Sequence, residues 1–318
     1  MLIEDWRQSA DAEVGQLLAA EDERWESRLS WDSSSALAIA ESARRAGLLP
    51  GFVAREAGLI VGWTYFLAHD GIVRIGSLAG SRSDVVRALL DAVIESPEAS
   101  IARRLQCFTF PDGGAVAAAL GRRRFAIERY LYLQATGAWS HSFEPRVRLR
   151  CWRTSDLPDA TRLAARAYAG SVSAACFSPN GRLDEWAAYL SSLQATTVLG
   201  AFDDECSLVA LDDRASASIG MVLVTWIAAD TAHVAQLAVE PAQRGRGVAT
   251  ALLDGAVAAA RRRGATRVTL LVAESNVPAQ RLYRERGFVE RAAFVFGERA
   301  RPTRSSARAF ESRVGLTA

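Results

Sequence analysis

The stretch that decides the fold reads LAVEPAQRGRGVAT and spans residues 237–250. An apolar segment leads through Pro241 into a glycine-rich turn, and the apolar residues that follow recur at three- and four-residue spacing up to Gly264, as in an amphipathic helix. Such a turn presents successive backbone N–H groups at the start of a helix, where they and the helix dipole can hold a pyrophosphate. The spacing is neither GxGxxG nor GxxxxGK[ST], so it predicts neither a dinucleotide-binding fold nor a P-loop. An ordinary solvated turn or an RNA-binding patch is the alternative.

The segments on either side of this turn predict an α/β order. Before it, strands are expected at 147–152, 197–202, 219–227 and 233–239, with helices after Asp156 and over 183–193. Residues 203–204 and 229–230 are the expected connections, so the three later strands form an antiparallel meander. After it, 267–273 is a buried strand, a helix begins near Pro278, and 288–296 supplies the last strand or two.

The first half of the chain repeats this order in weaker form. Its strands are expected at 51–57, 59–68, 72–78, 105–110 and 127–133, with helices over 85–94 and before Arg124. The repeat predicts an internal duplication with a period of roughly 160 residues. We therefore expect a first domain over 1–140, a second over 146–297 and an Arg-rich tail over 298–318.

Composition narrows the chemistry. The 318 residues carry 38 basic and 36 acidic side chains, a balance that does not favour nucleic acid or an anionic membrane as partner. The chain has no lysine, which excludes a Schiff-base lysine and a Walker lysine. Three separated histidines and four cysteines without a CxxC pair predict neither a metal centre nor a disulfide framework. The acidic N-terminus and the absence of a long apolar run predict a cytoplasmic protein.

A second motif, Asn276-x-x-Ala279-x-x-x-Tyr283-x-x-x-Gly287-Phe288, follows the first. Together with Arg244-x-x-Gly247-x-Ala249, it resembles the two signature motifs of the GNAT superfamily of N-acetyltransferases over about residues 147–296. The resemblance implies two tandem GNAT-like domains of the α/β (α+β) class, each a mixed, mostly antiparallel sheet flanked by helices. The arrangement also resembles that of the mycothiol synthases, which have one weak and one strong half.

The first half departs from both motifs. If Phe125 corresponds to Phe288, the tyrosine position becomes Leu120 and the asparagine position becomes Gly113. We therefore expect a degenerate N-terminal copy that supports the catalytic one.

The resemblance also implies a site for acetyl-coenzyme A as cosubstrate. A bulge would separate the strand before the loop from its neighbour, and backbone groups of Leu237 and Val239 would then bind pantetheine and the acetyl carbonyl. Amides from Gly245 to Thr250 would hold the pyrophosphate, and Asn276 would bind pantetheine. The expected coenzyme-binding residues are Leu237, Val239, Arg244, Gly245, Arg246, Gly247, Val248, Ala249, Thr250, Asn276, Ala279 and Tyr283.

Acyl transfer to an amine needs an acid for the departing thiolate and a base for the amine proton. Tyr283 matches the tyrosine that faces the coenzyme sulfur, and with a pKa near 10 it can donate a proton at pH 7; packing on an amphipathic helix is its alternative role. His233, four residues before Leu237, is the candidate base, although a strand-end histidine can equally bond a backbone group. Thr225 and Gln236, polar on apolar strands, are expected to line the acceptor pocket.

These residues predict an acetyl-coenzyme A-dependent N-acetyltransferase that acts on a primary amine, expected to be a small molecule because a second domain can enclose it. Transfer would be direct in a ternary complex, since neither motif holds a cysteine nucleophile. A non-catalytic coenzyme-binding sensor and a protein N-acetyltransferase are the alternatives. We expect no metal, no nucleic acid and no membrane partner, and a monomer, because the tandem copy can replace a second subunit.

Overall fold

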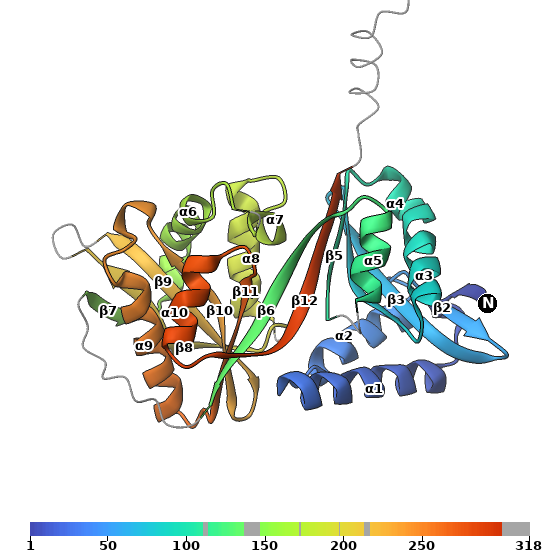
Figure 1. The fold of residues 1–318 in the computed structure, drawn as a ribbon, viewed down its shortest axis with the longest axis horizontal. Helices are drawn as coiled ribbons and strands as arrows, with labels where there is room; N and C mark the ends of the chain where they lie inside the picture. The colour runs from blue at the N-terminus through green and yellow to red at the C-terminus, as the bar shows by residue number, and fades with distance from the viewer. Residues whose placement is uncertain (111–113, 137–146, 172, 197, 213–216, 301–318) are drawn as a thin grey trace, which may run out of the picture. The chain divides into compact units, whose positions relative to one another are not determined.

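The computed structural model describes residues 1–110, 114–136, 147–171, 173–196, 198–212 and 217–300, and the chain divides into two compact units (Figure 1). Unit 1 comprises Met1–Leu17, Ile39–Arg129 and the chain from Ala293 onward. Unit 2 comprises Leu18–Ala38 and Tyr130–Ala292. The units therefore do not follow the expected ranges 1–140 and 146–297, because each takes segments from both halves of the sequence.

The strands of unit 1 form one sheet whose order begins at the N-terminal strand. That order is β1 (Leu2–Asp5), β2 (Gly51–Glu56), β3 (Leu59–His69), β4 (Ile72–Gly80), β5 (Arg104–Thr109) and β12 (Val289–Ala300). Its helices are α3 (Ser83–Glu95), α4 (Pro97–Ile101) and α5 (Ala115–Arg122), while α1 (Asp11–Leu29) and α2 (Ser34–Arg45) each belong partly to unit 1 and partly to unit 2. Apolar side chains of α3 and α5 pack on one face of this sheet, and Leu120 of α5 is fully buried there.

Unit 2 has the same strand order. Its sheet runs β7 (Arg148–Cys151), β8 (Ala201–Leu211), β9 (Ser218–Ala228), β10 (Thr231–Val239), β11 (Arg267–Ala273) and β6 (Ala126–Thr136). The pair β10 and β11 is parallel, and the other neighbouring pairs are antiparallel. The sheet is mixed and mostly antiparallel, as predicted, and the β8–β9–β10 meander is confirmed.

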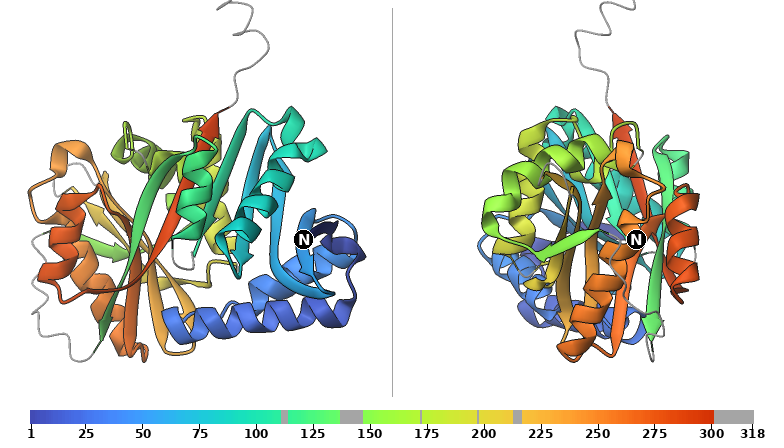
Figure 2. Two further views of the ribbon diagram at one scale, coloured as in Figure 1. Left: turned by 45° about the vertical axis from the view of Figure 1, so that its right-hand side comes forward. Right: turned by 90° about the vertical axis from the view of Figure 1, so that its left-hand side faces the viewer.

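Helices cover both faces of the unit 2 sheet (Figure 2). One face carries α9 (Val248–Arg262) and α10 (Val277–Glu285), and the other carries α6 (Leu157–Ala167), α7 (Ala174–Phe177) and α8 (Leu183–Ala195). Close packing of α9 depends on Gly220 of β9, where a Cβ atom would lie only 2.9 Å from Leu252 and 3.0 Å from Val248. This contact fixes the N-terminal turn of α9 beside the end of β10.

Each half gives its last strand to the other unit. Residues 130–136 of β6 pair with β11 of unit 2, and residues 295–300 of β12 pair with β5 of unit 1. The segment Leu18–Ala38 also belongs to unit 2, where the Tyr132 hydroxyl donates to the Leu29 carbonyl at 2.8 Å. The expected closing of the first sheet by 127–133 is therefore wrong, because an antiparallel edge accepts an equivalent strand from either half.

Two further expectations need correction. A connection was expected at Asp203–Asp204, but β8 continues through it with a bulge, since the Asp203 carboxylate accepts hydrogen bonds from the amides of Glu205 (3.0 Å) and Cys206 (2.9 Å). The tail was expected from residue 298, but β12 extends to Ala300 because it pairs with β5. Gly113, the residue aligned with Asn276, and the tail beyond residue 300 lie outside the described residues.

Candidate active site

The central feature of unit 2 is an opening between β10 and β11. These strands pair only from Thr231 to Val234 on β10, with residues 267–270 on β11. A register shift follows at Ala235, after which β10 stays paired with β9 up to Val239 and β11 stays paired with β6 up to Ala273. Within the described chain, the β11-facing edge of residues 235–239 has no ladder partner. Leu237 and Val239 lie on this edge, so backbone polar groups are available there to a ligand.

The glycine-rich turn leads from this edge into α9. A 3-10 turn (Pro241–Gln243) precedes it, and Gly245 and Gly247 have φ values of 73° and 80° in the left-handed region, which favours glycine. The first α9 amide with an acceptor is that of Ala251, which bonds the Gly247 carbonyl at 3.0 Å. Among the described residues, the six preceding amides, from Gly245 to Thr250, have no acceptor. They form a row of donors at a helix N-terminus, which suits an anion.

Charged side chains hold this loop in place. Arg244 donates through Nη2 to the Ala167 carbonyl at 2.6 Å, and Arg246 donates to Gln243 at 2.7 Å. Glu240, the acid at the end of β10 just before the turn, forms an ion pair with Arg166 at 2.8 Å. The acidic side chain is therefore neutralised, and the loop keeps the positive character that an anion site needs.

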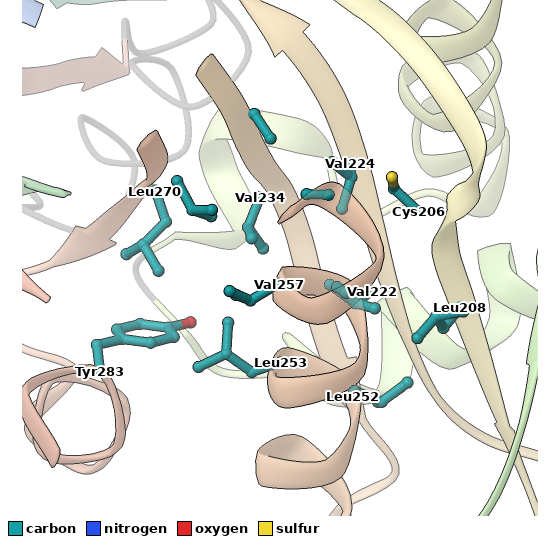
Figure 3. Close-up of a cluster of buried hydrophobic side chains, with 14 of the residues drawn as sticks. Cys206, Leu208, Val222, Val224, Val234, Leu252, Leu253, Val257, Leu270 and Tyr283 are labelled. Carbon is teal, nitrogen blue, oxygen red and sulfur yellow. The ribbon is translucent and has the colours of Figure 1, made fainter. Parts of the chain in front are cut away.

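The second motif builds α10. Asn276 caps this helix by accepting the Ala279 amide through Oδ1 at 3.3 Å, while no described residue accepts from its Nδ2. Tyr283 is 7% exposed, and its side chain points toward Leu253 and Val257 of α9 (Figure 3). Burial raises the pKa of Tyr283, so its hydroxyl stays protonated well above neutral pH.

An ion pair joins α10 to α9. Arg286, directly after α10, donates through Nε to Asp254 of α9 at 2.9 Å, and the Asp254 side chain is only 8% exposed. The two motifs are therefore held together, because each lies on one of these helices.

His233 occupies the paired part of β10 instead of the opening. Its Nδ1 shares a hydrogen bond with Thr269 Oγ1 at 2.9 Å, and its ring lies 5.1 Å from that of Trp31 and 6.3 Å from that of Tyr132. Burial lowers the pKa of His233 to about 3. The imidazole is therefore neutral at pH 7, and it faces away from α9, because the adjacent Val234 belongs to the α9-facing core.

Two polar side chains on the same face as His233 lack a full set of partners. Thr225 Oγ1 and Gln236 Nε2 are buried and have no hydrogen-bond partner among the described residues. Gln236 Oε1 accepts the hydroxyl of Tyr168, which directly follows α6, at 2.9 Å. Tyr168 is not a sequence-predicted site residue, because a tyrosine at a helix end belongs to neither motif and only the fold brings it to β10.

The remaining chemistry-bearing residues are dispersed. Within the described ranges, no three His, Cys, Asp or Glu side chains gather in a group that could hold a metal ion. Within the described residues, Cys107, Cys151, Cys176 and Cys206 form no disulfide. Over the part of the chain that the structure covers, no helix combines the length and apolarity needed to cross a membrane.

Comparison with known proteins gives a consistent result. The model of the acetyltransferase (GNAT) family matches residues 162–288, which include the opened strand and both motifs. Mycothiol acetyltransferase from Clavibacter sepedonicus is 30% identical over 230 residues, which is 70% of this chain and 70% of that protein.

Two solved structures share the fold over nearly the whole chain. A GCN5-related N-acetyltransferase from Sphaerobacter thermophilus has a TM-score of 0.68 at 17% identity, covering 94% of this chain and 96% of that one. A tandem GNAT protein from the clavulanic acid biosynthesis pathway has a TM-score of 0.65 at 17% identity, covering 95% and 100%. At this identity the likeness concerns the fold, and the expected tandem arrangement is confirmed.

Proposed function

Because the chain belongs to the acetyltransferase (GNAT) family, with two family folds in tandem, we propose that unit 2 binds acetyl-coenzyme A and transfers its acetyl group directly to a primary amine of a small molecule. The observation that carries this proposal is the opening between β10 and β11, which ends in a row of free backbone amides at α9. The relative named mycothiol acetyltransferase supports a small-molecule acceptor.

The donors in this site fit the coenzyme. The six amides from Gly245 to Thr250 would hold its pyrophosphate, since consecutive N–H groups at a helix N-terminus bind phosphate oxygens. The free edge of residues 235–239 and the Nδ2 of Asn276 would bind the amide groups of pantetheine. The coenzyme supplies the activated acetyl group, and the chain supplies binding, orientation and proton transfer.

Tyr283 is the proposed acid. As the amine nitrogen bonds to the acetyl carbon and the carbon–sulfur bond breaks, the thiolate takes the Tyr283 proton and the amine loses one. Burial keeps the phenol protonated, and packing against α9 restricts its rotation. Positioning both reactants in one opening supplies much of the remaining rate enhancement.

The base role expected for His233 is less well supported than a core role. A buried imidazole with a pKa of about 3 holds a proton poorly at neutral pH. Its hydrogen bond to Thr269 and its aromatic neighbours account for the residue without catalysis. We therefore propose that the amine reaches the site in its neutral form, with its proton passing to solvent.

Calorimetric titration with acetyl-coenzyme A tests the binding site. Gly247→Val should weaken binding at least tenfold, about 1.4 kcal/mol, because a side chain would stand beside the phosphate-binding amides. Gly264→Val is the matched control: both glycines have positive φ and open space around a Cβ, so strain is similar, but Gly264 ends α9 at its far end. Equal affinity of Gly247→Val and the control would overturn the loop assignment.

Release of free thiol with a panel of amines and peptides tests the reaction. Release with a small amine supports the proposal. Release with peptides alone would indicate a protein N-acetyltransferase, and binding without release would indicate a coenzyme-binding sensor.

A further inference from the structure

Gln236 is a buried carboxamide with half of its hydrogen-bonding capacity unused. The residue is 4% exposed, and both hydrogens of Nε2 lack an acceptor in the described chain. A buried donor without an acceptor costs about 1–3 kcal/mol, so such groups are rare unless a ligand or water completes them. The unpaired amide nitrogen therefore calls for an acceptor atom from outside the chain.

The orientation of this amide is set by Tyr168. The Tyr168 hydroxyl donates to Gln236 Oε1 at 2.9 Å, which satisfies the tyrosine and leaves Nε2 free. Aromatic rings hold Tyr168 in turn: Phe177 lies 5.5 Å away and Trp186 lies 5.2 Å away, between ring centroids. Tyr189 contacts both of these rings, at 4.6 Å and 6.3 Å. The ring neighbours of Tyr168 are thus aromatic, and among the described residues no carboxylate or guanidinium bonds the Gln236 amide.

The position of Gln236 relates it to the opening. It is the first residue of β10 to pair with β9 after the bulge, at the point where β10 has left β11. Its side chain lies on the α6 side of the sheet and not on the α9 side, at the level where β10 and β11 have separated. Tyr168 lies near Tyr283. Burial is the largest cause of the raised pKa of Tyr168, and the proximity of Tyr283 is the second.

We propose that Gln236 determines acceptor specificity by donating through Nε2 to a neutral oxygen, a hydroxyl or ether, on the carbon next to the reacting amine. Tyr168 is a positioning residue that acts through Gln236. A neutral oxygen is favoured over a carboxylate because the described partner of the amide is the neutral Tyr168 hydroxyl, and the nearby Arg244 guanidinium donates to the Ala167 carbonyl instead. This inference rests on the proposed function, and it narrows the acceptor to the class of vicinal amino alcohols.

Two probes of nearly equal shape test this inference. The probes trans-2-aminocyclohexanol and cyclohexylamine share the ring and the primary amine and differ by the neighbouring hydroxyl. Because that hydroxyl also lowers the pKa of the amine, kcat/KM is expressed per concentration of neutral amine for both probes. With wild type, kcat/KM should be at least tenfold higher for the amino alcohol, since a site built to bond a hydroxyl discriminates against an analogue that lacks it. Gln236→Leu should bring this ratio to about one, mainly through KM for the amino alcohol, with affinity for acetyl-coenzyme A unchanged.

Tyr168→Phe should lower the ratio several-fold, because the amide loses its orientation. Tyr132→Phe is the matched control: it removes a buried hydroxyl that bonds the Leu29 carbonyl, so it should keep the wild-type ratio. A wild-type ratio near one, or an unchanged ratio in Gln236→Leu, would overturn the inference.

Different results would overturn the inference on Gln236 and the proposed acetyltransferase function. Transfer to other amines of the panel but to neither probe overturns the inference and leaves the proposed function standing. Transfer to no amine overturns the proposed function and the inference together. The wild-type ratio needs no variant, so it remains informative if Gln236→Leu does not fold.

Discussion

Removal of the buried histidine should change how stability depends on pH. His233 is 5% exposed, bonds Thr269 and contacts Trp31 and Tyr132, and burial lowers its pKa from 6.5 to about 3. The unfolded chain therefore binds a proton at this residue between about pH 6.5 and 3, while the folded chain does not. Stability must fall as the pH falls through this window, because the proton favours the unfolded state.

The size of the effect follows from the two pKa values. The pKa of the unfolded imidazole is 6.5, so at pH 5, which is 1.5 pH units lower, the imidazole is almost fully protonated. Each pH unit below this pKa corresponds to about 1.36 kcal/mol of stability. Between pH 7 and pH 5, wild type should lose about 2 kcal/mol through His233 alone. In His233→Gln this contribution is absent, since an amide does not titrate.

Urea unfolding at pH 7, 6 and 5 measures the difference. From pH 7 to pH 5, the difference in free energy of unfolding between wild type and His233→Gln should decrease by about 2 kcal/mol. This corresponds to a change of about 1 M in the difference between their urea midpoints. His69→Gln, which removes an exposed imidazole of unit 1, is the matched control. If the free energy of unfolding depends on pH in the same way for wild type and His233→Gln, the conclusion that His233 is buried and neutral is refuted. A loss of turnover in a fully folded His233→Gln, with acetyl-coenzyme A still bound, would restore its role as base.

Three other outcomes are expected. Tyr283→Phe keeps the packing but loses the acid, so turnover should fall about 10²-fold with unchanged affinity for acetyl-coenzyme A, and unchanged turnover would remove the acid role. A fragment of residues 146–297 should not give a soluble, cooperatively unfolding domain, because β11 would lose its partner β6 and His233 its cover; a sharp thermal transition of this fragment would contradict the exchange. Gly220→Val should destabilise unit 2 by about 1–3 kcal/mol in urea unfolding, since its side chain would meet Leu252; an unchanged midpoint would contradict the close packing of α9.

The sequence predicted the second half of the fold well because its signals are local. The strand at 267–273, the helix after Gly247 and the helix near Pro278 each follow from the periodicity or capping of one short segment. The phosphate-binding character of the turn was predictable for the same reason, since free amides at a helix start depend only on the turn itself. The family resemblance implied the separation of β10 from β11, which no periodicity in either strand reveals.

The exchange of β6 and β12 could not be predicted from periodicity. Residues 130–135 of β6 and 294–297 of β12 are buried on both faces, and either edge offers the same ladder, so the partners of the two strands depend on long-range packing. The role of Tyr168 was hidden in the same way, because its partner Gln236 is 68 residues away. His233 illustrates the opposite error: the resemblance placed it at a functional position, whereas Trp31, 202 residues earlier (233 − 31), covers it.

The degenerate half helps to separate packing from chemistry at Tyr283. The aligned residue in the first half, Leu120, is fully buried in the apolar core of unit 1, and Tyr283 lies in the corresponding core of unit 2. Packing is thus the role that both positions share, and the hydroxyl is the group that only unit 2 has. Removing the ring would disturb both roles at once, because the cavity it leaves in the core would lower the free energy of unfolding by about 3–5 kcal/mol. Removing the hydroxyl alone isolates the chemistry, so a change in turnover without a change in stability can be assigned to proton donation.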